Sequence, residues 1–468
     1  MADNKEDEKL LRLRDFAKRN SLLDKQLELL FAQQASLSSR DEQYRQLLRE
    51  FGLDDESQKD RHGVRHFKMV SMVYIVVKGF KMFAGSANPQ EQLDLLDELF
   101  INVSDIAEKY GLVKIPTVGD NILLCGGVEK ENKTNPIDAA CAASDIVKWM
   151  AEFKTKRNVI WNVQIGIHTG PVIARYAGKR KLPYTLSGNN VLTVTRLAMT
   201  AEAGMIALSP MTYELVKEFF DVEPYSCIPV RYSGDMKVSK LVRLKPELVN
   251  NDPSKKWSDA FDLCYSRVQF MDIQEFMLDM LEQQLPKNLY YHNVKHTIDV
   301  TTEVELIGWA EGVKESDILL LKVAGLFHDS GMIKVDKGHE NVSCEYAQEI
   351  LPTYGYPQSK IDTIKRIIMA TQLPHTPTDI LEAVIQDSDL DYLGRADFIP
   401  VSNLLYKEIV ERNGTNMTIN QWNKIQIKFI SNHQYYTKTA QSLREVNKQS
   451  QIERLKELVD ECDRNGVE

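Results

Sequence analysis

Histidine and aspartate side chains gather in the last third of the sequence in a pattern that could hold a metal ion. Six of the nine histidines follow residue 290. His292 and His296 are four residues apart, so they lie on one face of a helix or of its first turn. His328 and Asp329 end the apolar run LLLKVAGLF, at the boundary of a core, where both groups are costly to bury unless they are bonded or bind a metal.

A cluster of acidic residues follows in the segment IQDSDLDYLG. Asp387, Asp389 and Asp391 are spaced two residues apart, so they cannot all face the same way. One carboxylate can face the core and a metal, while the others bond to backbone or solvent. Imidazole and carboxylate ligands without a thiolate suit Mn²⁺, Fe, Co²⁺, Zn²⁺ or Mg²⁺. Such an ion lowers the pKa of a bound water and neutralises phosphate oxygens, as phosphoester hydrolysis requires.

The order of these residues resembles the H…HD…D pattern of the HD superfamily of metal-dependent phosphohydrolases. The segments YHNVKH, LFHDSG, HENVSCEYA, IIMATQ and DSDLDYLG carry the resemblance. It implies an all-α domain and one or two divalent ions held by His296, His328, Asp329 and Asp389, with Asp329 also acting in catalysis. Asp387 remains the alternative for the last ligand.

The segment YHNVKHTIDV also resembles the Y-H-N-x-x-H-A-x-D-V signature of cyclic-nucleotide phosphodiesterases, which belong to the same superfamily. This resemblance implies that His292 is the general acid, a role that suits imidazole. The alternative is that His292 only caps or orients its helix. His339 follows the HD pair at the place where two-metal members use further histidines, so it is a candidate ligand of a second ion or a substrate contact.

The middle of the chain resembles the class III nucleotidyl cyclase catalytic domain in five ordered motifs. They are VSMVYIVVKGF, TVGDNILLCGG, QIGIHTGPVIA, YTLSGNNVLTVTRL and AGMIALSPMTYELV. The resemblance implies a nucleotide site at a homodimer interface, to which Asp120 and Arg196 still belong. Val76 replaces one of the two metal-binding aspartates, Pro116 replaces the base-reading lysine, and Leu192 replaces the transition-state asparagine. We therefore expect a catalytically inactive domain.

Three regions must position these residues in a chain of 468 residues, which is too long for one hydrophobic core. Residues 1–60 read as a helical segment, either an extension of the next domain or a dimerising coiled coil. Residues 61–250 alternate strands and helices, which predicts an α+β domain with one main sheet, ferredoxin-like by the cyclase resemblance. Residues 251–468 read as helices broken by Gly, Pro and Asn turns, which predicts an all-α domain.

Composition limits the partners and the compartment. The net charge of −9 argues against a broad nucleic-acid surface. The N-terminus has no apolar signal core, and the longest apolar run is too short to span a membrane. The scattered cysteines fit free thiols in a reducing cytosol. We therefore expect a cytoplasmic protein that contacts neither nucleic acid nor a membrane.

These patterns predict a metal-dependent phosphohydrolase that acts on a nucleotide or a related phosphorylated small molecule. The cyclase-like domain would serve homodimerisation or nucleotide-dependent regulation. Two alternatives remain: a cyclic-nucleotide phosphodiesterase in particular, or a signalling scaffold without catalysis. A working cyclase is disfavoured by Val76, Pro116 and Leu192.

Overall fold

The computed structural model describes residues 64–79, 89–117, 121–128, 132–176, 184–230, 234–250 and 257–465. The predicted helical segment at residues 1–60 and the candidate Asp120 lie outside these ranges. Residues 173–187 belong to a compact unit separate from the one that holds most of the sheet and all of the described helices. No helix among the described residues is both long enough and apolar enough to cross a membrane.

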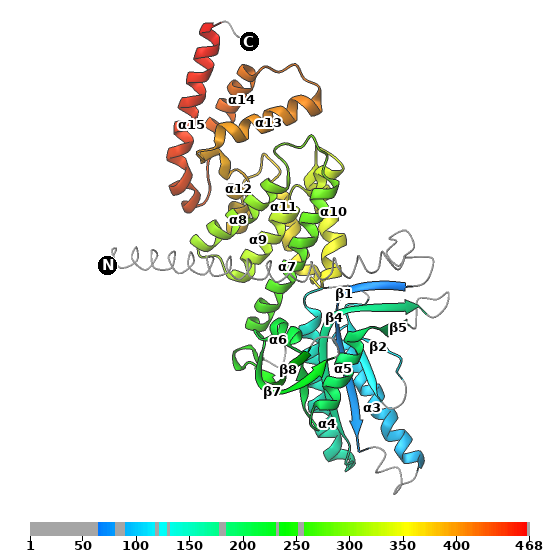
Figure 1. Ribbon diagram of the computed structural model, residues 1–468. Coiled ribbons are helices and arrows are strands. Elements are labelled where there is room, and N and C mark those ends of the chain that lie inside the picture. Colours follow the sequence, from blue (N-terminus) through cyan, green and yellow to red (C-terminus); the bar gives the residue numbers. More distant parts are fainter. Residues whose placement is uncertain are drawn as a thin grey trace, which may run out of the picture. The chain divides into compact units, whose positions relative to one another are not determined.

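The first half of the described chain is a mixed sheet with helices, as the alternating pattern predicts (Figure 1). The strands run in the order β2-β3-β1-β4-β6-β8-β7, and β5 pairs with β4. The strands are β1 (Val64–Lys78), β2 (Val113–Ile115), β3 (Ile122–Gly126), β4 (Asn162–Tyr176), β5 (Tyr184–Ser187), β6 (Ile206–Leu208), β7 (Phe220–Val230) and β8 (Gly234–Leu244). The helices are α3 (Pro89–Lys109), α4 (Asn135–Arg157), α5 (Asn189–Thr200) and α6 (Pro210–Val216), with the 3₁₀ helix η2 (Pro246–Leu248) after the last strand.

Apolar side chains cover both faces of this sheet. Ile206 and Leu208 of β6 face a large core with α3, α4 and α6, whereas Ala207 faces a smaller core with α5. Successive side chains of a strand point to opposite faces, so α5 covers the face that α3 and α4 leave open. Helix α5 also lies close to β4: a Cβ at Gly166 would fall 2.5 Å from the backbone nitrogen of Ala198. The long hairpin β7–β8 had no counterpart in the sequence prediction.

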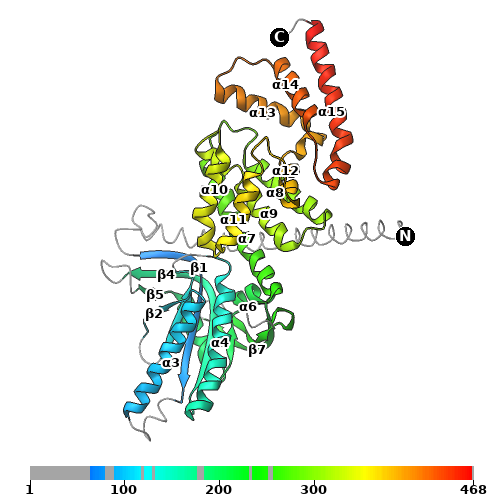
Figure 2. The same ribbon diagram turned by 180° about the vertical axis from the view of Figure 1, so that it is seen from behind.

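The second half of the chain is helical, as predicted (Figure 2). Its helices are α7 (Asp259–Gln284), α8 (Val294–Ala310), α9 (Glu315–Phe327), α10 (His339–Ile350), α11 (Gln358–Met369), α12 (Ile380–Asp389), α13 (Phe398–Asn413), α14 (Ile419–Asn432) and α15 (Lys438–Asn465). Short 3₁₀ helices, η3 (Ser330–Ile333), η4 (Leu351–Tyr354) and η5 (Asp391–Gly394), follow α9, α10 and α12.

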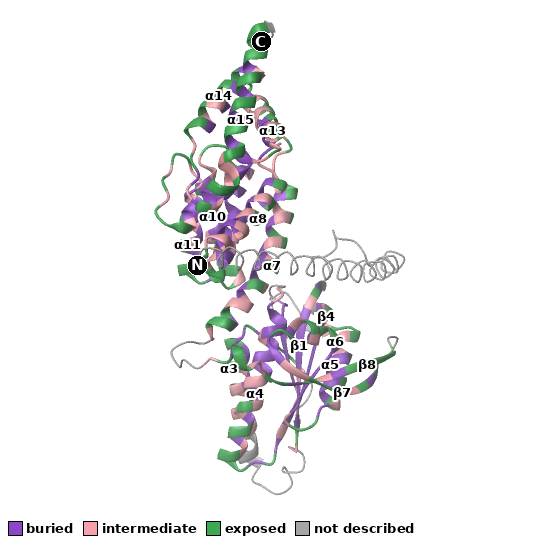
Figure 3. Cartoon of the chain, turned by 90° about the vertical axis from the view of Figure 1, so that its left-hand side faces the viewer, coloured by how far each residue is buried: buried purple, intermediate pink, exposed green. Residues whose placement is uncertain are grey.

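Two apolar clusters organise these helices. The larger joins buried residues of α7 to α12, and the smaller joins η5 and the helices α13, α14 and α15. Figure 3 shows buried segments on the inward sides of α8 and α10. Helix α9 is mostly apolar, and its residues from Val323 to Phe327 are buried. The two polar residues that follow it, His328 and Asp329, therefore lie in the interior.

Candidate metal centre

The start of helix α8 directs His296 into the interior. Asn293 precedes the helix, and its side-chain oxygen accepts hydrogen bonds from the backbone nitrogens of Lys295 and His296 at 2.9 and 3.2 Å. This N-cap satisfies donors that have no partner within the helix. His296 then lies on the buried side of the first turn, with 9% of its surface exposed.

His328 and Asp329 end helix α9 beside His296. His328 is fully buried, and its Nδ1 lies 2.8 Å from the carbonyl oxygen of Gly325. A carbonyl only accepts, so Nδ1 carries a proton. The Nε2 atoms of His328 and His296 lie 3.3 Å apart. The Oδ2 atom of Asp329 lies 3.2 Å from the first of these nitrogens and 3.4 Å from the second.

Asp389 completes the cluster from the last turn of α12. Its Oδ1 atom lies 3.1 Å from Nε2 of His296 and 3.5 Å from Nε2 of His328. One donor atom each of His296, His328 and Asp329 falls within 4.8 Å of the others, and Asp389 adjoins this group through the histidines. The structure thus brings all four predicted ligands together.

The donor atoms of this cluster fit a cation. Oδ2 of Asp329 is buried and makes no hydrogen bond, although two imidazole nitrogens lie close to it. A neutral His328 with its proton on Nδ1 presents a lone pair from Nε2, so acceptor atoms face each other. Such a group is stable only when a cation or a proton lies among its members. The residues present therefore suit a divalent metal, and imidazole with carboxylate is a common donor set for it.

The acid–base properties of the cluster indicate what replaces the ion when it is absent. Burial lowers the pKa of His328, but Asp329 and Asp389 outweigh burial, and the pKa lies well above its usual value. Burial raises the pKa of Asp329, but His328 and His296 outweigh it, and the pKa lies well below its usual value. Protons bind where the metal would bind, so metal binding must release them.

His339 lies on the other side of Asp329. Its Nε2 is 3.2 Å from Oδ1 of Asp329 and 3.6 Å from Oε1 of Glu340, while its Nδ1 donates to the carbonyl oxygen of Asp336 at 2.8 Å. Burial lowers the pKa of His339, but Asp329 outweighs it and raises the pKa to about 9. The two oxygens of Asp329 thus face different histidines, an arrangement that could bridge two ions.

His292 has a partner that the sequence pattern did not reveal. The buried carboxylate of Glu408, on α13, accepts a hydrogen bond from Nδ1 of His292, and also accepts from the backbone nitrogens of Tyr291 and His292 at 2.8 and 3.1 Å. The ring of His292 lies 6.0 Å from that of His296 and 6.4 Å from that of His339. In the sequence segment YKEIVER, Glu408 looks like an ordinary solvent-exposed glutamate. The one signal for its role is its position on the buried side of helix α13.

The other two aspartates of the acidic cluster bond elsewhere. Asp387 is fully buried and accepts hydrogen bonds from the backbone nitrogens of Tyr436 and Thr437 and from the hydroxyl of Thr437. Asp391 pairs with Arg444 at 2.5 Å. The geometry therefore favours Asp389 over Asp387 as the fourth ligand.

The positions that matter for cyclase chemistry are spread over β1 and α5. Val76 is partly buried, and Leu192 is 62% exposed. Arg196 is exposed and donates to the carbonyl oxygen of Pro229 at 3.0 Å. The side chains of Val76 and Leu192 offer no atom that binds a metal or a phosphate.

Two segments of the chain match models of known protein families. Residues 63–242 match the model of the adenylate and guanylate cyclase catalytic domain, and residues 293–395 match that of the HD domain.

Individual relatives match parts of the chain. A membrane guanylyl cyclase of Dictyostelium discoideum is 29% identical over 193 residues, which are 41% of this chain and 13% of that protein. An adenylate cyclase of Mycobacterium tuberculosis is 27% identical over 175 residues, 37% of this chain and 40% of that protein. The chain thus spans less than half the length of either relative. Among solved structures, the guanylate cyclase domain of RhGC from Catenaria anguillulae in complex with GTP is 26% identical, with a TM-score of 0.36. The match covers 39% of this chain and 100% of the solved chain.

The chain therefore joins a class III cyclase catalytic domain, at residues 63–242, to an HD domain at residues 293–395.

Proposed function

We propose that the helical domain is a metal-dependent phosphohydrolase that acts on a phosphate ester of a nucleotide or a related small molecule. The observation that carries the proposal is that His296, His328, Asp329 and Asp389 converge in the interior, where their acceptor atoms need a cation or a proton between them. A divalent ion bound there would neutralise phosphate oxygens and activate a water for attack on phosphorus.

The chain's own residues supply the proton for the leaving group in this proposal. Nδ1 of His292 is occupied by Glu408, so Nε2 is the atom left to meet the substrate. A proton on Nε2 can pass to the departing oxygen as the bond to phosphorus breaks. Glu408 fixes the ring orientation through a carboxylate that two backbone nitrogens hold in place.

Hydrolysis of a cyclic nucleotide is the second candidate within this chemistry. The His292–Glu408 pair favours it, because an alkoxide leaving group such as a ribose oxygen needs a proton donor more than a phenolate does. The cyclase domain adds a reason to test nucleotides, since such domains bind them.

We further propose that the cyclase domain dimerises or senses a nucleotide rather than making a cyclic product. Val76 and Leu192 remove groups on which phosphoryl transfer depends. Incubation of the full chain with ATP or GTP and Mn²⁺ should give no cyclic nucleotide, and a cyclic product would reject this part of the proposal. Light scattering should show a dimer.

The test of the hydrolase proposal is a substrate panel with the purified chain and Mn²⁺. The panel holds bis(4-nitrophenyl) phosphate, cAMP, cGMP, cyclic dinucleotides, (p)ppGpp and dNTPs. We expect hydrolysis of at least one substrate, loss of it with chelator, and loss of it in Asp329→Asn. The matched control is Asp362→Asn, which changes an exposed aspartate of α11 and should leave activity intact. Full activity in Asp329→Asn would reject the proposal.

A further inference from the structure

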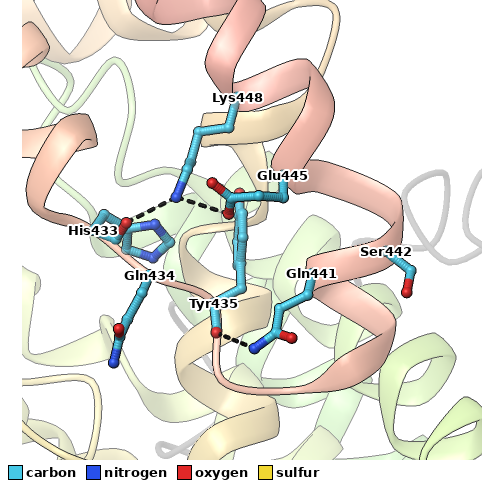
Figure 4. A pocket seen from close by; sticks show the side chains of 7 residues that line it. All are labelled: His433, Gln434, Tyr435, Gln441, Ser442, Glu445 and Lys448. Carbon is cyan, nitrogen blue, oxygen red and sulfur yellow. Dashed lines mark hydrogen bonds and ion pairs between the residues drawn. The ribbon is translucent and has the colours of Figure 1, made fainter.

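A polar pocket lies at the turn that joins α14 to α15, and the metal centre does not use it. Its volume is about 440 Å³, within the range of small-molecule sites. Figure 4 shows the side chains that line it, which come from residues 433–435 of the turn and from the first turns of α15. None of them contributes to the cluster of His296, His328, Asp329 and Asp389.

Lys448 provides a buried donor in this pocket. Only 2% of its surface is exposed, and its Nζ donates to the carbonyl oxygen of His433 at 2.8 Å and to Glu445 at 2.9 Å. An ammonium group has three donors, so one is not used by these two acceptors, and the group also lies 5.2 Å from the centre of the Tyr435 ring. Glu445 also accepts from Gln449 at 3.0 Å, so both of its oxygens are engaged. The pair of Lys448 and Glu445 is electrically neutral, which disfavours a phosphate or another anion.

His433 provides a nitrogen in need of a partner. Its Nδ1 is buried and makes no hydrogen bond. The ring is held edge-on to Tyr435, with the ring centres 4.6 Å apart at 84°. Burial and the nearby Lys448 lower the pKa of His433 to about 4, so the ring is neutral at neutral pH. A buried nitrogen without a hydrogen bond is destabilising, and a ligand that donates to it would remove that penalty.

Two further side chains add both kinds of hydrogen-bonding group. The amide nitrogen of Gln441 donates to the carbonyl oxygen of Tyr435 at 2.8 Å, so the side-chain oxygen of Gln441 stays available as an acceptor. Ser442 contributes a hydroxyl, which can donate and accept. The pocket thus offers donors and acceptors side by side without net charge.

We propose that this pocket binds a small uncharged molecule whose neighbouring groups both donate and accept hydrogen bonds, as a ribose diol or a nucleobase edge does. Nucleosides combine both features and are the ligand class that the site fits. The same turn holds Asp387 of α12 through Tyr436 and Thr437, and Tyr435 donates to the carbonyl oxygen of Leu390 at 3.3 Å. A ligand in the pocket therefore contacts the segment that anchors the end of α12.

The experiment is calorimetric titration of the full chain, freed of metal by EDTA, with adenosine, guanosine, ribose and AMP. We expect saturable binding of one nucleoside per chain, with AMP weaker than adenosine. His433→Phe keeps the ring packing and removes the nitrogen, and Gln441→Leu removes the acceptor. Each should weaken binding about tenfold, the worth of one hydrogen bond.

Two controls separate this site from the others in the chain. His296→Ala in the metal centre and Arg196→Ala in the cyclase domain should each leave the affinity unchanged. Ribose binding with the same variant pattern would assign recognition to the sugar, and binding of nucleosides alone would assign it to the base. The proposal fails if no probe binds at millimolar concentration, if His433→Phe and Gln441→Leu bind as the unmodified chain does, or if AMP binds more tightly than adenosine and His433→Phe weakens the binding of both. Similar circular dichroism melting curves for the variants would show that they remain folded.

Discussion

Replacing Glu408 by glutamine should separate proton donation from metal chemistry at the proposed active site. The backbone nitrogens of Tyr291 and His292 both donate to Oε2 of Glu408, whereas Nδ1 of His292 donates to Oε1. A glutamine can keep an oxygen at the first position, but its amide group then meets Nδ1 with a donor. Nδ1 must become an acceptor, and the protonated form of the ring loses its partner.

The structure sets the size of the effect. Two of the three hydrogen bonds survive in Glu408→Gln, so the free energy of unfolding should fall by only about 1–2 kcal/mol. Glu408→Ala would leave one buried and two partly buried donors without an acceptor and cost about 3 kcal/mol or more, which makes it the poorer probe. Loss of general acid catalysis lowers the rate about 10²- to 10⁴-fold for a leaving group that needs a proton.

The assay compares two leaving groups at saturating Mn²⁺. The value of kcat/KM for a substrate with a ribose-oxygen leaving group should fall about 10²-fold or more in Glu408→Gln, while that for bis(4-nitrophenyl) phosphate should change little, because nitrophenolate leaves without a proton. Glu411→Gln is the matched control, since Glu411 lies one turn along α13 and accepts an exposed hydrogen bond from the hydroxyl of Tyr290. Equal losses on both substrates would contradict a proton-donor role for His292, and so would no loss on either.

Three further outcomes follow from the same contacts. Mn²⁺ at a hundred times its Kd should stabilise the unmodified chain by about 2.7 kcal/mol in thermal melts and should leave Asp329→Asn unaffected; equal stabilisation of both would contradict the ligand assignment. Asp387→Leu should lower the free energy of unfolding in urea by about 3 kcal/mol or more, because three donors lose their acceptor. Asp389→Leu should mainly weaken Mn²⁺ binding, and the reverse pattern would exchange the roles of the two aspartates. The pKa of His433 is about 4 in the folded chain and about 6.5 in the unfolded chain, so the unfolded chain takes up the proton first as the pH falls. The free energy of unfolding should therefore fall by up to about 3 kcal/mol between about pH 6.5 and pH 4. His433→Phe should lack this decrease, and identical pH profiles of the two chains would refute the assignment.

Local patterns in the sequence predicted much of the fold. The strand and helix periodicities predicted the strands β1 and β4 and the helices α3, α4 and α5, and the run LLLKVAGLF predicted the buried helix α9 that ends before His328. Matches to the two family models confirmed both family resemblances. The sequence did not predict the hairpin β7–β8, because its side chains are mostly exposed or half-buried and its strands lack a clear alternation of apolar and polar residues.

The parts of the site that escaped prediction depend on tertiary packing. Glu408 meets His292 across more than a hundred residues, and its sequence neighbourhood is that of an ordinary amphipathic helix. The choice between Asp387 and Asp389 was open because spacing places them on different sides without saying which side faces the histidines. The structure separates them through Tyr436 and Thr437, which lie far along the chain and bond to Asp387.

The most direct test of the metal centre is anomalous diffraction from crystals of the full chain grown with Mn²⁺. We expect a peak within bonding distance of Nε2 of His296, Nε2 of His328 and a carboxylate oxygen each of Asp329 and Asp389. A second peak between Asp329 and His339 would show a two-ion centre. Well-ordered crystals with no peak among the four side chains, or with Mn²⁺ bound only elsewhere, would contradict the account.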